Sequence, residues 1–250
     1  MKLLKLVLRM LFGALLFSSA PLLAQVVVPA SASFSLNGGS IDLAGSNLQV
    51  AGTFDVAAGA IQNAANIGIL AGGAINGGSG TITLFGDFSN VGSFTAGSSH
   101  VNFVDGALAQ SNITGNTTFA NLSFVSLTGK SYVFGVGSTQ SIQSQLQILG
   151  TAGFGIQIKS STAGQVAFIN LLAGGTQDIN YVGVSNVHAI GIHLAPSLTN
   201  DGGTGDSFGW FAAVAPTVAT PIPTLSFGML LLLALAFSGM AFAALRRSFK

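Results

Sequence analysis

Small residues recur every seven positions in the first third of the chain, and this spacing limits the folds open to it. Three consecutive blocks read Ser40-Ile-Asp-Leu-Ala-Gly-Ser, Asn47-Leu-Gln-Val-Ala-Gly-Thr and Phe54-Asp-Val-Ala-Ala-Gly-Ala, and a degenerate fourth begins at Ile61. A period of seven can indicate a coiled coil, but a glycine in nearly every block destabilises a helix, and the flanking charges are missing. The blocks instead predict strands of four or five residues, each followed by a tight corner. We expect Gly45, Gly52, Gly59 or Asn66 to adopt positive φ at these corners.

Apolar and polar residues alternate further along the chain. Phe154, Ile156 and Ile158 alternate with Gly155, Gln157 and Lys159, and residues 142–148 place apolar side chains between glutamines. A period of two predicts half-buried strands. Glycine-bearing breaks recur at short intervals, and outside its two ends the chain has no long stretch of helical periodicity.

Short strands at this cadence predict an all-β fold, either a right-handed parallel β-helix (a β-solenoid) or a β-sandwich. Small corner residues in place of long loops favour the solenoid, in which we interpret the seven-residue blocks as stacked rungs. Residues 80–103 resemble, in their repeat style, filamentous bacterial surface proteins with right-handed β-helices. Because a stack leaves strand edges open at its ends, we expect residues 26–35 or the segment at Trp210 and Phe211 to cap an end.

The N-terminus has the three parts of a secretory signal peptide. Lys2, Lys5 and Arg9 form a basic start, residues 10–17 form a short apolar run, and Ala24 supplies a small residue before Gln25. The apolar run is shorter than the roughly 20 residues of a membrane span. We therefore predict a signal helix in residues 1–24, recognised by the Sec translocon and cleaved between Ala24 and Gln25. A retained membrane anchor is the alternative.

The C-terminus predicts a transmembrane helix. No charged residue lies between Asp206 and Arg246, and residues 225–245 form an apolar run that would be roughly 30 Å long as a helix. Arg246, Arg247 and Lys250 follow directly and predict a cytoplasmic stop-transfer end. An Ala/Pro/Thr linker, residues 212–221, separates this tail from the predicted exported β domain of residues 25–211.

The start of this tail also resembles a known sorting signal. Ile222, Pro223, Thr224, Leu225 and Ser226, followed by an apolar helix and a basic end, resemble the IPTL-CTERM signal, a relative of PEP-CTERM signals. The resemblance covers residues 222–250. It implies processing by an exosortase-type membrane enzyme and release from the inner membrane to the cell surface or extracellular matrix of a Gram-negative bacterium. Where the family usually places an acidic or amide residue after the serine, this chain has an aromatic one. An uncut single-span anchor is the alternative.

Composition restricts the function of the exported part. Between residues 25 and 221 the only cations are Lys130 and Lys159, whereas all seven acidic residues of the chain, each an aspartate, lie there. This gives a net charge of about −5, so a basic surface for nucleic acid is absent. The chain has no cysteine and no glutamate. Carbohydrate-active enzymes need clustered carboxylates or a base beside a metal, so we expect no catalysis and no cofactor.

Three local motifs carry little chemistry. Residues 205–209 match G-x-S-x-G, but no Asp or His follows Ser207, as a hydrolase triad in that order requires. Asp201 and Asp206 lie in an oxygen-rich turn that resembles a calcium-binding repeat, and an ordinary turn is the alternative. His188 and His193 are five residues apart and would project from opposite faces of a strand, so they predict no shared metal.

These features together predict a non-catalytic surface or matrix protein. It would be adhesive through an extended β surface, with a surface polysaccharide as one candidate partner. The alternatives are a polysaccharide-active enzyme on a β-helix and a spacer that stays tethered to the membrane.

Overall fold

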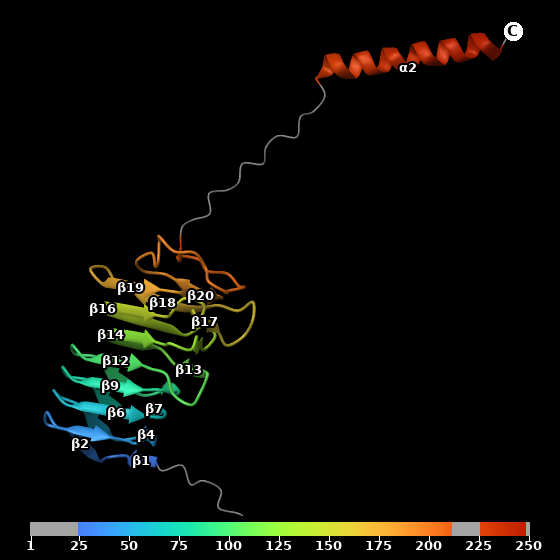
Figure 1. Ribbon diagram of the computed structural model, residues 1–250. Helices are drawn as coiled ribbons and strands as arrows, with labels where there is room; N and C mark the ends of the chain where they lie inside the picture. Colours follow the sequence, from blue (N-terminus) through green and yellow to red (C-terminus); the bar gives the residue numbers. More distant parts are fainter. Residues whose placement is uncertain (1–24, 212–225, 249–250) are drawn as a thin grey trace, which may run out of the picture. The chain divides into compact units, whose positions relative to one another are not determined.

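The computed structural model describes residues 25–211 and 226–248, with side chains as far as residue 240 (Figure 1). The chain divides into two compact units, Met1–Ala213 and Val214–Lys250. The predicted signal peptide, the linker and the first four residues of the sorting motif lie outside the described residues. So does Lys250, as do the side chains of Arg246 and Arg247.

The first unit consists of parallel strands in three sheets. Sheet A has eight strands: β1 (Gln25–Val28), β4 (Asn47–Val50), β7 (Ile67–Ile69), β10 (Phe88–Asn90), β13 (Gln110–Thr114), β15 (Ser131–Phe134), β17 (Ile156–Ser160) and β20 (Val182–Ser185). Sheet B has four: β2 (Ser33–Ser35), β5 (Thr53–Asp55), β8 (Ala74–Asn76) and β11 (Ser93–Thr95). Sheet C has nine: β3 (Ser40–Asp42), β6 (Ala60–Ala64), β9 (Thr81–Leu84), β12 (His100–Phe103), β14 (Thr117–Val125), β16 (Thr139–Leu149), β18 (Ala167–Leu171), β19 (Thr176–Asn180) and β21 (Val187–Ala189).

The chain visits sheets A, B and C in turn and then starts again one layer higher, so the sheets stack as the sides of a β-solenoid (Figure 1). Ile41 pairs with Ile61, and Ile61 pairs with Ile82, so the stretch from one of these isoleucines to the next is one turn. The predicted all-β parallel solenoid is confirmed. The alternative β-sandwich, which is built from antiparallel sheets, is wrong.

The seven-residue blocks are sides of a turn and not whole rungs. The block at Ser40 begins β3, the block at Asn47 begins β4, and Phe54 lies in β5. Three successive blocks therefore make one turn, and a block stacks on the block three places along. The interpretation of each block as one rung of the stack is wrong. Hydrogen bonds join each strand to the strand one full turn away, and a period of seven does not say how many blocks make up a turn.

The corners use small residues for two different reasons. Gly45 has a φ of 82°, as predicted, and Ala44 beside it has a φ of 48°. Gly52, Gly59 and Asn66 do not have positive φ, so that part of the prediction is wrong. A Cβ on Gly52 would lie 2.3 Å from the carbonyl oxygen of Ala32, and a Cβ on Gly59 would lie 2.2 Å from that of Gly39. Glycine is required there by the close approach of the turn below.

The corner between sheets B and C straightens in the middle of the stack. In β16, residues 139–142 pair with β18 and residues 145–149 pair with β19, so one strand spans two sides. β14 does the same, and its register shifts between Phe119 and Asn121. From β14 onward, sheet B has no separate strands in the described residues. The first halves of β14 and β16, and then β18 and β21, occupy that side of the solenoid.

Stacked inward side chains fill the interior. The largest aromatic cluster is fully buried and its members touch from turn to turn; it comprises Phe88, Phe103, Phe119, Phe124, Tyr132 and Phe134. The ring centroids of Phe124 and Tyr132 are 4.5 Å apart, and those of Phe103 and Phe124 are 5.1 Å apart. Contacts at these distances add stabilisation beyond the apolar area buried.

The two ends of the stack differ. At the C-terminal end Trp210 and Phe211 are buried, Leu194 bridges to Trp210, and the Phe211 N–H donates to the Leu194 carbonyl at 2.8 Å. The predicted aromatic cap is confirmed there. Residues 26–35 instead form the first turn itself, with Val27 52% and Phe34 44% exposed around an apolar hollow of about 330 Å³. Of the two positions predicted for a cap, the C-terminal one is therefore occupied by it.

The second unit contains one helix, α2 (Phe227–Ser248). It begins directly after Ser226, the last residue of the sorting motif, whose carbonyl accepts hydrogen bonds from the N–H groups of Met229 and Leu230. The described side chains of α2, residues 227–240, are exposed. In the part of the chain that is described, no helix meets both the length and the apolarity needed to cross a membrane.

Candidate functional site

Three aromatic side chains lie one above another on the outer surface of the last turns, and we call them the aromatic column: Phe168, His188 and Phe208. Phe168 of β18 pairs in register with His188 of β21, and the Ala189 N–H donates to the Phe208 carbonyl in the turn that follows. The ring centroids of Phe168 and His188 are 6.1 Å apart, and those of His188 and Phe208 are 5.6 Å apart.

Local sequence explains why these rings point outward. In β18 the inward positions Ala167, Ile169 and Leu171 are buried, so alternation places Phe168 and Asn170 outside. A Cβ on Gly209 would lie 2.0 Å from the Ala189 carbonyl oxygen, so only glycine lets the last turn lie this close to β21.

A polar column runs beside the aromatic one, and we call it the hydroxyl–amide column: Thr118, Ser141 and Asn170. Strand register aligns Thr118 with Ser141 and Ser141 with Asn170. The exposed side chain of Ile190 follows in the next turn. Thr139 pairs in register with Phe168 and continues the aromatic column downward with a hydroxyl. The surface thus combines ring faces with donors and acceptors that carry no charge.

A carboxylate borders the aromatic column. Asp206 Oδ2 lies 2.9 Å from His188 Nε2, and the Asp206 side chain remains 63% exposed. The pair holds the imidazole edge-on to the Phe168 ring and tilted by 54° against the Phe208 ring, and it leaves the carboxylate available to solvent. The arrangement can bind a polar molecule that has an apolar face, but it offers no nucleophile beside a base.

The spacing of the three aromatic-column residues in the sequence is a signal of their alignment. Phe168, His188 and Phe208 are evenly spaced in the sequence, and the interval between them is the one that separates Ile41 from its pairing partner Ile61, which is one turn. The strand alternation indicated outward positions but not which of them stack.

Sheet C carries a second set of outward polar residues. Register aligns one row through Thr81, His100, Asn121, Gln145 and Thr176, and a second row through Thr83, Asn102, Ser123, Gln147 and Asp178. Hydroxyl and amide groups predominate in both rows, so this face is polar with little charge over several turns.

The predicted calcium candidates are not brought together. Asp206 pairs with His188, whereas the Asp201 backbone is hydrogen-bonded to Val182 and Gln157. The neighbouring Asn200 is also committed to backbone, because its amide bonds the N–H and C=O of Val184. Within residues 25–211 and 226–248, no three His, Cys, Asp or Glu side chains are grouped as metal ligands. The turn is built as a structural brace for β20.

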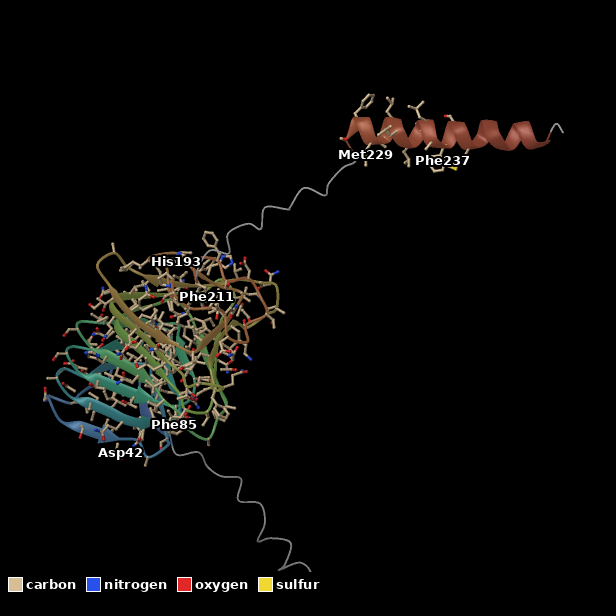
Figure 2. The ribbon with its side chains drawn as sticks, turned by 45° about the horizontal axis from the view of Figure 1, so that its top comes forward. Asp42, Phe85, His193, Phe211, Met229 and Phe237 are labelled. Carbon is tan, nitrogen blue, oxygen red and sulfur yellow. The ribbon has the colours of Figure 1, made fainter. Side chains whose placement is uncertain are left out.

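The two histidines lie in different surroundings, but not on opposite faces of one strand as predicted, because β21 ends at Ala189. His188 lies in the aromatic column, while His193 Nε2 contacts the Phe211 carbonyl at the capped end (Figure 2). Ser207 of the G-x-S-x-G match uses its carbonyl to accept a hydrogen bond from the Trp210 N–H within the final tight turn. That turn closes the stack and ends at Phe211, the last described residue of the first unit.

A buried lysine was not singled out by sequence reasoning. Lys130 is 1% exposed, and its Nζ donates to the carbonyls of Phe85 and, at 3.0 Å, Val104. It also lies 5.6 Å from the ring centroid of Tyr132. Burial lowers the Lys130 pKa, opposed by the nearby carboxylates of Asp105 and Asp87.

Tyr132 beside Lys130 is fully buried, and Asp105 is partly buried. Burial raises the pKa of Tyr132 above its ordinary range, and the nearby Asp105 carboxylate adds to this. Burial alone would raise the Asp105 pKa, but hydrogen bonds involving Ser126 and Leu127 hold it below its ordinary value. The Lys130 ammonium thus joins the Phe85 and Val104 carbonyls by hydrogen bonds beside the loop between β12 and β13. Because the Lys130 side chain is buried, we call this arrangement a structural clamp.

No family model, curated protein or solved structure matches the chain. The candidate surfaces therefore rest on the geometry and charge of this chain alone.

Proposed function

We propose that this protein is a non-catalytic surface or extracellular-matrix protein of a Gram-negative bacterium, exported by its N-terminal signal and sorted through residues 222–250. Its exported part works by presenting the outer faces of the solenoid. The observation that carries the proposal is the pair of low-charge polar rows on sheet C together with the aromatic column, which are surfaces for contact. We also propose a right-handed winding, because parallel crossovers are almost always right-handed.

The solenoid suits this role because different residues of each strand form the core and the outer surface. Most inward positions from β4 onward are apolar and buried, with buried polar exceptions such as Asn90 and Gln140, while outward positions can vary without loss of the stack. A long ladder of outward positions gives one chain many repeated contacts with a polymeric partner.

The tail supports sorting through its order of features. The motif of Ile222, Pro223, Thr224, Leu225 and Ser226 precedes an uncharged apolar run, and Arg246 and Arg247 follow it. We propose that residues 225–245 hold the precursor in the inner membrane with the C-terminus in the cytoplasm. An exosortase-type enzyme would then remove the tail.

Mass spectrometry of both protein ends, in surface and membrane fractions, tests this proposal. Surface protein should begin at Gln25 and lack the apolar helix. Pro223→Ala should leave full-length chain in the membrane, whereas Pro216→Ala in the linker should be processed normally. An intact tail on surface-released protein would contradict the proposal.

A permanently tethered spacer is the second candidate. It is favoured by Phe227 and Gly228, which follow the motif where a polar residue is usual. Recovery of wild-type and Pro223→Ala chains alike as full-length inner-membrane protein would support it.

A further inference from the structure

We infer that the aromatic column and the hydroxyl–amide column together bind an uncharged polysaccharide. The inference rests on the proposed function, since a surface protein meets such polymers, and it assigns the contact to particular side chains. The site comprises the aromatic column, the hydroxyl–amide column, and the neighbouring Thr139 and Asp206.

The first argument is exposure. Phe208 is 67% exposed, and Ile190, which continues the hydroxyl–amide column in the next turn, is 51% exposed. Burying such a ring against a partner is favourable at about 25 cal/mol per Å² of apolar surface. Phe208 packs against His188 and is held by a turn that Gly209 makes tight, so the ring is presented on a rigid element.

The second argument is the chemistry beside the rings. Sugar rings have C–H faces that pack on aromatic side chains and hydroxyl groups that need donors and acceptors at their edges. Ser141 and Asn170 are neighbours in register, one turn apart, at the spacing of about 4.8 Å between adjacent strands. The exposed Asp206 carboxylate, oriented by His188, adds a strong acceptor for hydroxyl groups.

The third argument is charge. In residues 25–211 the only lysines are Lys130, which is buried, and Lys159, which lies on β17 of sheet A. Asp206 borders the site and would repel a carboxylate or sulfate. An acidic polysaccharide would therefore lose its hydration without gaining a counter-charge, so the ligand is neutral.

An extended peptide fits less well. Peptides that bind sheets usually add a strand to an open edge. Here β18 is paired on both sides, with β16 and with β21, so its backbone groups are used within the stack. Recognition must pass through the outward side chains, which favours a partner rich in hydroxyl groups.

The full chain, purified in detergent, can be tested by affinity electrophoresis and calorimetry against soluble amylose, soluble β-glucan and polygalacturonate. Wild type should bind at least one neutral glucan and not polygalacturonate. Phe208→Ala should weaken binding about fivefold or more, the loss expected for one aromatic contact of about 1 kcal/mol. Asn170→Ala should weaken it as well.

Phe154→Ala is the matched control, because Phe154 is 58% exposed and lies outside the site. It should bind like wild type. The inference is overturned if neither glucan binds, if only polygalacturonate binds, or if both phenylalanine variants behave alike. Capture of a protein partner that is insensitive to Phe208→Ala would also count against it. Because purified chain is used, failure of tail processing in cells would leave this result unaffected, and the reverse also holds.

Discussion

Replacing Lys130 by methionine tests the interpretation of this residue as a structural clamp. Methionine keeps most of the length and apolar volume of the side chain but removes the ammonium group. The carbonyls of Phe85 and Val104 then lose the donor that now bonds both of them. Asp105 and Asp87 also lose a nearby positive charge.

The magnitude follows from opposing effects. The Val104 carbonyl left without its charged donor costs about 1–3 kcal/mol. The Phe85 carbonyl keeps a 3.4 Å hydrogen bond from Ser111 Oγ and costs no more than that, so the two together cost at most about 6 kcal/mol. Removing a buried ammonium group returns part of this, because its desolvation is no longer required. We expect a net loss of about 2–4 kcal/mol in the free energy of unfolding. For a domain of this size that corresponds to a fall in Tm of roughly 6–12 °C.

The assay is urea and thermal unfolding of the full chain in detergent, followed by far-ultraviolet circular dichroism, which reports all turns of the solenoid. Lys159→Met is the control, because Lys159 projects outward from β17 and is not buried. It should change stability by less than about 0.5 kcal/mol. If Lys130→Met were as stable as Lys159→Met, the clamp interpretation would be refuted.

Three further predictions follow from the same packing. Burial lowers the Lys130 pKa, so the unfolded chain holds this proton more tightly than the folded chain does. The free energy of unfolding of wild type should therefore rise relative to that of Lys130→Met as pH rises toward 10.5. Urea unfolding between about pH 7 and 10 measures this difference. A stability difference that does not change with pH would contradict a lowered Lys130 pKa. Gly52→Ala should cost about 1–3 kcal/mol, since its Cβ would lie 2.3 Å from the Ala32 carbonyl oxygen, and more than Gly72→Ala, where φ is 80° but nothing lies within 4 Å. Equal Tm values for the two would rule out close approach as the reason for glycine at position 52. Phe124→Ala should cost about 3–5 kcal/mol because three aromatic rings pack against it, and a change below about 1 kcal/mol in circular dichroism melts would count against a tightly packed core.

Local patterns in the sequence specify most of the strands but not how they stack. Alternation from Phe154 to Lys159 predicts a half-buried strand. β17 is that strand from Ile156 onward, whereas Phe154 lies outside it and is 58% exposed, so the prediction is wrong for Phe154. The seven-residue blocks predict the corner spacing, which is present from β3 to β5, but β3 and β5 have three residues each and are shorter than the predicted four or five. The number of sides in one turn determines which block pairs with which. That number depends on how the side chains of all sides pack in the interior of the solenoid. The period of seven was therefore assigned to the wrong level of structure.

The candidate site was hidden for the same reason. Phe168, His188 and Phe208 occupy three separate sequence contexts, and only the length of a full turn aligns them. Lys130 was hidden more completely, because its partner Phe85 is 45 residues away and is reached across the interior. A charged residue in a strand-rich sequence is normally expected outside. Neither arrangement could be derived without knowing which turns are neighbours.

The stacking also gives a physical reason for the unusual composition. In a solenoid each outward position faces the same position one turn away, at about 4.8 Å, so like charges in one row repel along its whole length. Uncharged amides avoid this and bond between turns instead: Asn66 Nδ2 donates to Asn47 Oδ1 at 2.8 Å, and Asn63 Nδ2 donates to Asp42 Oδ1 at 3.0 Å. Only 6% of the chain is charged. Rows selected for stacking in this way are surfaces of hydroxyl and amide groups, and such surfaces complement polymers that are themselves polar and uncharged.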